Sequence, residues 1–341
     1  MTGLRENRDP VILQGEICSP PMPKEDTDTG PEWSCFAYGP GVCIRYEREG
    51  SGPTPILLLH GLAASRTTWD DLRTRFPAER YTLYLIDLMG FGRSSKPRDG
   101  EYGPLEQAGA ILTFLADRQL CGVVLVGHSY GGTIALMAAL MARRSAWQHL
   151  IAGLVLIGAP AWPQPLPRFF RYLKAPFLGS VVLKLLPTRF VVTRALESVY
   201  YDRKLVDDLH IERYADCFRG TGTINALVRT VRQLVPDHWE DFCAEYPWLD
   251  KPLLLIWGRQ DRVVKLWQGE RLRDTIPGAH LDIIDRCGHN PHEEHPDETW
   301  RSIQRFLDRV PAQGQEMMSD VECEATLSLK QSSFTATLDS H

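Results

Sequence analysis

The chain has 341 residues, of which 43% are hydrophobic and 24% are charged, and its formal net charge at pH 7 is −5. This length suits one large domain plus an insertion, and the charge gives no bulk electrostatic reason to expect a nucleic-acid partner. No run of 18 or more apolar residues is present, so the sequence predicts no membrane-spanning helix.

The two ends of the chain differ in composition from the rest. Residues 1–32 contain five prolines and many charges, so we expect a disordered leader. The leader lacks the apolar region of a signal peptide. Residues 311–341 are rich in Ser and Thr and are also predicted to be disordered. After the leader, alternating residues at 35–48, around Gly39-Pro40-Gly41, predict a β-hairpin.

Six short, largely apolar runs predict buried strands. They lie at residues 56–59, 83–86, 123–126, 154–157, 252–257 and 281–285. Stretches of helical composition separate most of them. Strands that alternate with helices predict a mostly parallel, doubly wound α/β sheet with helices on both faces.

The sequence Gly127-His128-Ser129-Tyr130-Gly131 joins the third of these strands to a helix rich in Ala, Leu and Met. A sharp turn at this point would expose the Ser129 hydroxyl, and side chains at the two glycine positions would clash inside the turn. We interpret Ser129 as a nucleophile on such an elbow. The alternative is a chance match in a chain with 27 glycines.

A serine nucleophile needs a base, and the base needs an orienting acid. In elbow-type enzymes the acid and then the histidine follow the serine along the chain. Asp261 comes just after the strand at 252–257, at the sheet edge where α/β proteins place functional groups. It could equally cap a helix beginning near residue 264.

His289 follows the strand at 281–285 and is the candidate base. A lone histidine is more often a surface or capping residue, but His289 has the expected place in the order. His292 and His295 compete with it and rank lower, because they lie further into the next predicted helix.

The fourth part of such a site is an oxyanion hole. The loop at 60–65, which begins with His60-Gly61, follows the first apolar strand. A backbone N–H of this loop could join the N–H of Tyr130, the residue after the nucleophile. The alternative for the loop is a simple strand-ending turn.

These segments together resemble the α/β-hydrolase family in its compact form with one inserted helical cap. The resemblance covers roughly residues 35–310 and includes a full match to the family's D-x-x-G-x-G-x-S loop, at residues 87–94. It implies that Ser129 is the nucleophile, Asp261 the acid and His289 the base. It also implies that the N–H groups of Leu62 and Tyr130 form the oxyanion hole.

The residue at the elbow narrows the chemistry. Relatives that open epoxides or displace halide carry Asp there, whereas Ser129 favours acyl transfer. The predicted function is a serine hydrolase that cleaves a carboxylic ester or related acyl compound through an acyl-enzyme. The alternatives are a C–C bond or lactone hydrolase, a cofactor-free perhydrolase or haloperoxidase, and a non-hydrolytic ligand sensor.

Residues 161–247 show no strand pattern and many prolines, and we expect them to form the cap over a core at 33–160 and 248–310. The first part, residues 168–194, interleaves large apolar residues with Arg and Lys. One interpretation is an interfacial helix pair with weak contact to a membrane surface; the favoured one is an amphipathic cover over the pocket.

The sequence indicates no metal or cofactor. The eight cysteines form no C-x-x-C pair, and without an export signal we interpret them as free thiols in a reducing, cytoplasmic compartment. The metal-binding template H-E-x-x-H, started at His292, needs a second histidine at position 296, where the chain has Pro296. The segment Gly90-Phe91-Gly92 lacks the third glycine of a dinucleotide-binding loop. We expect a small acyl compound as the partner, no nucleic acid and no required cofactor, and the sequence leaves the oligomeric state open.

Overall fold

The computed structural model describes residues 33–165 and 186–310, so the predictions for the leader and the tail lie outside the described residues. Each of the six predicted strands and both hairpin strands are present. The strands are β1 (Ser34–Gly39), β2 (Val42–Glu49), β3 (Thr54–Leu59), β4 (Tyr81–Ile86), β5 (Val123–His128), β6 (Ile151–Ile157), β7 (Leu253–Gly258) and β8 (His280–Ile284).

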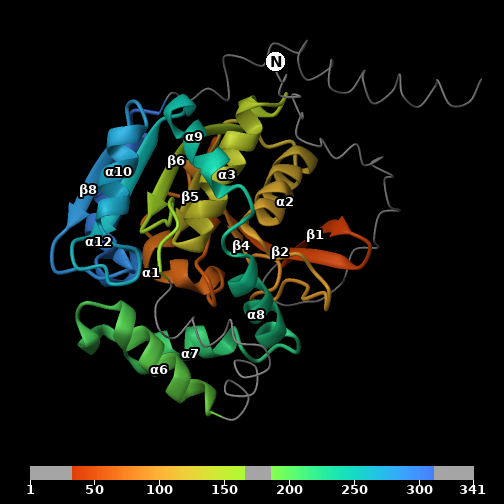
Figure 1. The fold of residues 1–341 in the computed structure, drawn as a ribbon, viewed down its shortest axis with the longest axis vertical. Helices are drawn as coiled ribbons and strands as arrows, with labels where there is room; N and C mark the ends of the chain where they lie inside the picture. The colour runs from red at the N-terminus through yellow and green to blue at the C-terminus, as the bar shows by residue number, and fades with distance from the viewer. Residues whose placement is uncertain (1–32, 166–185, 311–341) are drawn as a thin grey trace, which may run out of the picture.

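The strands form one sheet, in the order β1-β2-β4-β3-β5-β6-β7-β8 (Figure 1). The pairs β1/β2 and β2/β4 are antiparallel, and all the other neighbouring pairs are parallel. The prediction of a mostly parallel α/β sheet is confirmed. The order also puts β3, β5, β6, β7 and β8 side by side, so the loops after these strands open at one edge.

Helices cover both faces of the sheet. One face carries α2 (Pro104–Asp117), α3 (Tyr130–Arg143) and α10 (Trp267–Thr275), and the other carries α1 (Asp70–Arg73) and α12 (Pro296–Leu307). Alternate residues of each strand pack to opposite faces, since Leu57 and Leu59 belong to the first core and Ile56 and Leu58 to the second. The doubly wound arrangement is therefore confirmed as well. Shorter helical elements are η1 (Arg66–Trp69), η2 (Gln148–Leu150) and α11 (Pro291–Glu294).

The expectation that all cysteines are free thiols is wrong for the hairpin. The register of β1 and β2 pairs Cys35 with Arg45 and Ala37 with Cys43, which makes the two cysteines diagonal neighbours. Their Cα atoms are 5.6 Å apart, within disulfide range, and they form a disulfide bond. Spacing along the chain could not show this, because the pairing depends on the register. Cys217, Cys243 and Cys287 are thiols.

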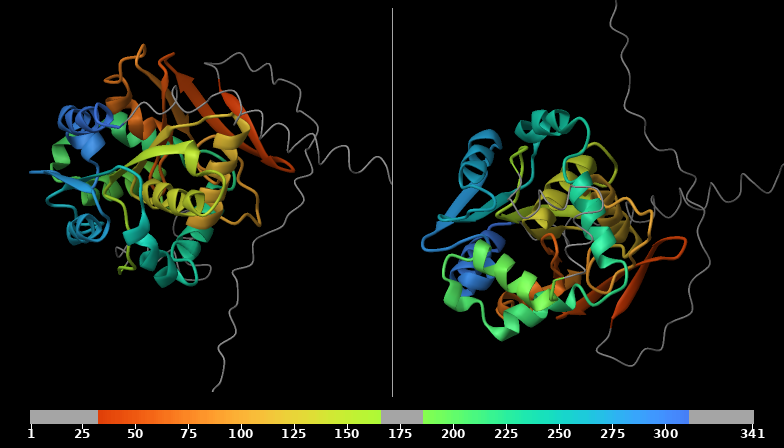
Figure 2. Two further views of the ribbon diagram at one scale, coloured as in Figure 1. Left: turned by 90° about the horizontal axis from the view of Figure 1, so that it is seen from above. Right: turned by 60° about the horizontal axis from the view of Figure 1, so that its bottom comes forward.

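Between β6 and β7 the described residues form helices and no strand. These are α6 (Thr188–Val199), η3 (Arg203–Leu205), α7 (Asp208–Asp216), α8 (Thr223–Gln233), α9 (Trp239–Glu245) and η4 (Tyr246–Trp248). Figures 1 and 2 show α6, α7 and α8 grouped at one end of the molecule, apart from the helices on the sheet. Helices α6 and α7 share a small core of their own, centred on Leu196 and Ile211. We call this segment the insertion; the domain limits given above stay a prediction.

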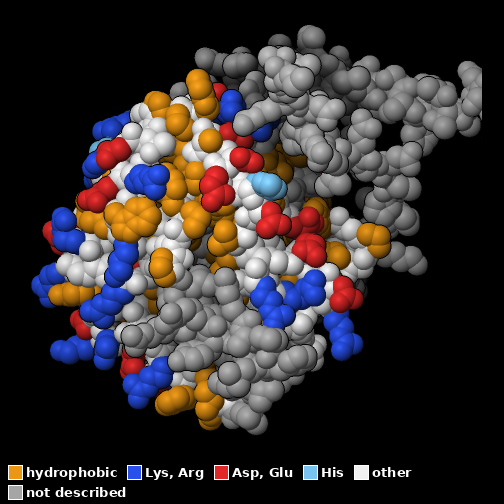
Figure 3. All heavy atoms as spheres, in the orientation of Figure 1, with side chains coloured by type: hydrophobic (Ala, Val, Ile, Leu, Met, Phe, Trp, Pro, Cys, Tyr) orange, Lys and Arg blue, Asp and Glu red, His pale blue; other side chains and the backbone are white. Residues whose placement is uncertain are grey.

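Much of the basic, apolar stretch of the insertion lies outside the described residues. Of its described cations, Arg189 pairs with Asp208 and Glu212, and Arg194 pairs with Glu197. Acidic and basic side chains both occur on the face shown in Figure 3. No helix among the described residues is long and apolar enough to cross a bilayer. Contact with a membrane surface stays a prediction.

Candidate active site

Ser129 lies in a strained turn between β5 and α3. Its φ of +51° and ψ of −116° are unusual for a residue with a side chain, and such strain is concentrated at functional sites. A Cβ on Gly131 would lie 2.2 Å from the Leu59 carbonyl oxygen, and one on Gly127 would lie 2.4 Å from the Gly131 oxygen. Only glycine fits at these two positions, so the turn has the geometry of the elbow that the sequence predicted.

The turn brings Ser129 to His289 and Asp261. The Nε2 atom of His289 is 2.9 Å from the Ser129 Oγ, and its Nδ1 atom is 2.7 Å from the Asp261 Oδ2. The three residues follow the carboxyl ends of β5, β8 and β7, and these ends lie at the same edge of the sheet, with β6 between β5 and β7. Ser129 and His289 are 160 residues apart in the sequence, and the structure joins them and Asp261 in one hydrogen-bonded chain.

Asp261 is held by backbone groups on its other side. Its Oδ1 atom accepts the N–H groups of Val263 at 2.7 Å and Val264 at 2.9 Å. Helix α10 begins at Trp267, with Leu266 at its N-cap. The alternative that Asp261 caps this helix is therefore wrong. The carboxylate closes the turn before the helix and still has one oxygen for His289.

The two competing histidines lie elsewhere. The Nε2 atom of His292 is 2.9 Å from the Thr68 hydroxyl, and that of His295 is 3.1 Å from the Arg286 carbonyl oxygen. Neither forms a hydrogen bond with Ser129 among the described contacts. Of the three candidates, His289 alone is placed to take a proton from Ser129.

The loop after β3 is fixed by His60. This residue is fully buried, and burial lowers the pKa of its imidazole, which favours the neutral form. The Leu88 N–H donates to Nε2 at 3.0 Å, so we assign the ring proton to Nδ1, which is 2.8 Å from the Gly61 carbonyl oxygen. The ring thereby holds the backbone just before Leu62.

The two predicted oxyanion donors lie at the same cavity as Ser129, because Leu62 and Tyr130 both line it. Within residues 33–165 and 186–310, neither backbone N–H donates to another group. Both are therefore available to a bound carbonyl oxygen.

His128 belongs to the motif around Ser129, and in the structure it also contacts the backbone of His289. Its Nε2 atom is 3.0 Å from the His289 carbonyl oxygen. Burial, together with the nearby His292 and His289 rings, lowers the pKa of His128 well below its usual value. The neutral ring donates its Nε2–H to the backbone of His289. The position of His128 next to Ser129 in the sequence does not predict this contact with the loop after β8.

The described wall of the cavity above Ser129 is mostly apolar. It comes from the core and from α6, α7, α8 and α9, and it includes Trp162, Val191, Leu196, Phe218, Leu227 and Trp239. None of the described wall residues is Lys, Arg, Asp or Glu. Several polar side chains in the wall are already bonded within the protein: Thr133 to Pro160, Gln164 to Val263 and Ser198 to Ala195.

Comparison with known proteins places this chain in a family. The model of the alpha/beta hydrolase fold family matches residues 54–296, more than half of the chain. An uncharacterized protein of Mycobacterium tuberculosis is 29% identical over 295 residues, which covers 82% of this chain and 83% of that protein. A 2-hydroxy-6-oxononadienedioate/2-hydroxy-6-oxononatrienedioate hydrolase of Burkholderia vietnamiensis is 28% identical over 280 residues, 80% and 93% of the two chains.

A solved structure agrees with the assignment to this family. The crystal structure of a bacterial membrane phospholipase A is 27% identical and has a TM-score of 0.67, with 82% of this chain and 86% of that chain covered. The chain therefore belongs to the alpha/beta hydrolase fold family. Like its named relatives, it is a hydrolase.

Proposed function

We propose that the protein is a serine hydrolase that cleaves esters of apolar acyl groups. The observation that carries the proposal is the hydrogen-bonded chain from Ser129 through His289 to Asp261, which lies at a cavity whose described wall is apolar and without charged side chains. The chain is the arrangement that activates a serine hydroxyl, and the cavity suits an acyl group without charge.

In the proposed reaction His289 takes the proton of Ser129 through Nε2 as the serine oxygen attacks the acyl carbon. Negative charge then develops on the former carbonyl oxygen, and the N–H groups of Leu62 and Tyr130 stabilise it. Asp261 accepts the hydrogen bond from Nδ1 and stabilises the imidazolium. Return of the proton to the departing alkoxide leaves an acyl-enzyme.

Water completes the cycle. It enters after the alcohol has left, His289 removes one of its protons, and the hydroxide attacks the acyl carbon. The second tetrahedral intermediate uses the same two N–H groups, and its collapse frees the acid and Ser129. The insertion supplies much of the apolar wall, so it acts as the cap that limits access of water to the acyl group.

The named relatives give a second candidate, a hydrolase of a charged keto acid. The Burkholderia relative is named for dioate substrates, which carry carboxylates. The described wall of this cavity offers no cation to pair with a carboxylate, and an unpaired buried charge is costly. We therefore rank an uncharged ester above a dioate.

The test is hydrolysis of p-nitrophenyl esters, from acetate to palmitate, by the wild type and by Ser129→Ala. We expect turnover that increases with acyl length before it levels off, and a loss of about 10⁵-fold or more in kcat for the variant. Ser145→Ala, at an exposed serine beyond α3, is the matched control and should retain full activity.

Turnover that persists in Ser129→Ala would refute the proposal. If the folded wild type cleaves no ester but cleaves a dienoate keto acid, the second candidate replaces it. Cleavage of a lactone alone would indicate a lactone hydrolase. Peroxide-dependent oxidation that requires Ser129 would indicate a perhydrolase. Tight binding of ligand without turnover would indicate a sensor.

A further inference from the structure

The loop that carries His289 is bonded to the insertion through main-chain atoms. The backbone N–H of His289 donates to the carbonyl oxygen of Val199, the last residue of α6, at 2.8 Å. At Gly288 a Cβ would lie 2.3 Å from the same oxygen and 2.7 Å from the Tyr201 nitrogen. The insertion therefore contacts the proposed base directly, and the contact is too close for a side chain at residue 288.

Glu294 links the same two segments. Its Oε1 atom accepts the N–H groups of Gly288 at 3.0 Å and Asn290 at 3.2 Å, which lie on either side of His289. Its Oε2 atom accepts the Tyr201 N–H at 2.7 Å. The residue is 7% exposed, so water cannot readily replace these bonds. Both oxygens of the carboxylate take part. Oε2 also accepts the Gly288 N–H at 3.1 Å and so contacts both segments, whereas Oε1 contacts only the loop of His289.

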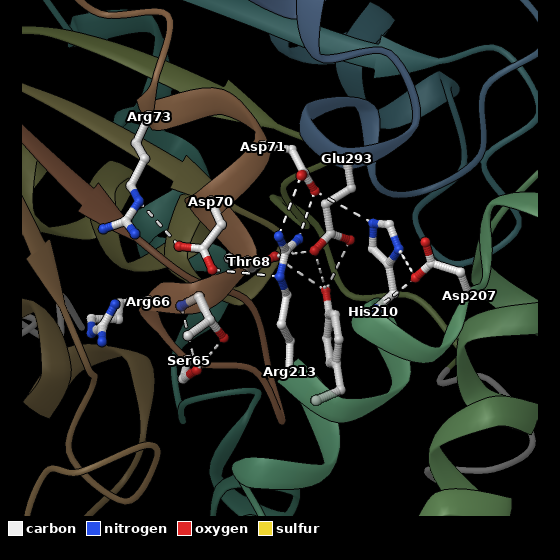
Figure 4. Close-up of polar contacts among 12 residues, drawn as sticks. Ser65, Arg66, Thr68, Asp70, Asp71, Arg73, Asp207, His210, Arg213 and Glu293 are labelled. Atoms are coloured by element: carbon white, nitrogen blue, oxygen red, sulfur yellow. Dashed lines mark hydrogen bonds and ion pairs between the residues drawn. The ribbon is translucent and has the colours of Figure 1, made fainter.

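Glu293 forms a parallel link to side chains. It accepts hydrogen bonds from the Tyr200 hydroxyl at 2.6 Å and from the Asn290 amide at 2.5 Å. The hydroxyl groups of Thr68 and Tyr214 also donate to it, at 2.8 Å and 3.1 Å. Figure 4 shows Glu293 beside Thr68 of η1 and close to Arg213 of α7. This buried carboxylate thus joins α6 and α7 to the core next to the base loop.

We propose that Glu294 is a positioning residue, which with Glu293 fixes the direction of His289 by tying its loop to residues 199–201 of the insertion. The inference rests on the proposed role of His289 as the base. Proton transfer requires the imidazole to stay within hydrogen-bond reach of Ser129, and a displacement of about 1 Å can lower the rate by about 100-fold. Binding of the acyl group does not need this alignment, so the effect falls on kcat.

The main test is Glu294→Gln, which keeps the size of the side chain but leaves only one oxygen able to accept. We expect kcat for a p-nitrophenyl ester to fall by about tenfold to 100-fold while KM changes by less than about threefold. The far-downfield proton resonance of the bond between His289 and Asp261 should broaden or shift. Glu298→Gln, at an exposed position in α12, is the matched control and should change neither readout.

A second pair of variants covers the case in which Glu294→Gln does not fold. Tyr200→Phe removes one hydroxyl that reaches Glu293, whereas Tyr201→Phe changes an exposed ring and keeps the backbone N–H. We expect a kcat about threefold lower or more for Tyr200→Phe than for Tyr201→Phe, at similar KM.

The inference is overturned if folded Glu294→Gln keeps the kcat and the proton resonance of the wild type, even with a lower melting temperature. Where that variant is unfolded, equal kcat for the two tyrosine variants overturns it. These outcomes leave the proposed function intact as long as Ser129→Ala is inactive. Activity in Ser129→Ala would instead remove the proposed function and this inference with it.

Discussion

Asp261 divides its carboxylate between His289 and the backbone. One oxygen accepts from His289 and the other from the N–H groups of Val263 and Val264. The second set of bonds fixes the carboxylate in place, so the orientation of the imidazole follows from the turn after β7. An amide at this position would keep the backbone bonds but could offer an N–H to His289 and favour the wrong tautomer.

We therefore predict that Asp261→Asn lowers kcat by about 10⁴-fold with little change in KM and in melting temperature. The measurement is steady-state hydrolysis of the best p-nitrophenyl ester, alongside thermal unfolding. Asp285→Asn, at an exposed residue after β8, serves as the control. A loss below tenfold in folded Asp261→Asn would contradict the role given to Asp261.

At this scale the sequence predicted the site residues because each follows the end of an apolar strand. The structure brings Ser129, Asp261 and His289 together as that pattern requires. The pattern is silent on His128, Glu293 and Glu294, whose contacts cross between the core and the insertion. Two adjacent glutamates just after a histidine are a weak signal, since most such pairs lie in water.

Among the elements, helix α6 contributes both to the wall of the cavity and to the contact with the loop of His289. Six of its residues line the cavity: Val191, Val192, Ala195, Leu196, Ser198 and Val199. Their spacing of three and four residues puts them on one side of the helix. The same helix ends at the carbonyl that accepts from His289. The wall of the cavity and the support of the base are therefore parts of one element.

We predict that Ala195→Trp shortens the cavity and moves the optimum of the ester series to shorter acyl groups. The indole would fill space that an acyl chain otherwise occupies, so the loss should be largest for the longest esters. Thr193→Trp, on the same helix but outside the wall, should leave the optimum unchanged. An unchanged optimum in folded Ala195→Trp would show that α6 does not contact the acyl group.

The strands were the easiest elements to predict, and the reason is their burial. Parallel strands covered on both faces are continuous apolar runs, which is why β3, β4, β5, β6 and β7 could be found. The order of β4, β3 and β5 in the sheet, and the disulfide between Cys35 and Cys43, depend on pairing between strands. A single sequence carries no signal for either.

In the molecule as a whole, an ionic cluster joins the insertion to the core. His210 of α7 lies with Nε2 3.4 Å from Asp71 and Nδ1 2.8 Å from Asp207, and Arg213 also pairs with Asp71 (Figure 4). The carboxylate of Asp71, and then that of Asp207, raise the pKa of His210 to about 9. His210 and Arg213 in turn lower the pKa of Asp71 to about 2.

The raised pKa gives a direction to the pH dependence of stability. An unfolded histidine has a pKa near 6.5, so the stabilisation by His210 is complete below about pH 6.5 and is lost as the pH rises through about 9. We predict that His210→Gln lowers the melting temperature at pH 6 and has little effect at pH 10. The check is thermal unfolding across this range, with exposed His149→Gln as the control. An equal loss at both pH values would contradict the ionic role.

On the side of the insertion, the link to the loop of His289 uses two main-chain groups. Val199 contributes a carbonyl oxygen, which every residue has, and Tyr201 an N–H, which every residue except proline has. Random drift at these two positions therefore leaves the link unbroken. The wall residues of α6 can therefore be substituted for a different acyl group without removing the main-chain groups that contact the loop of His289.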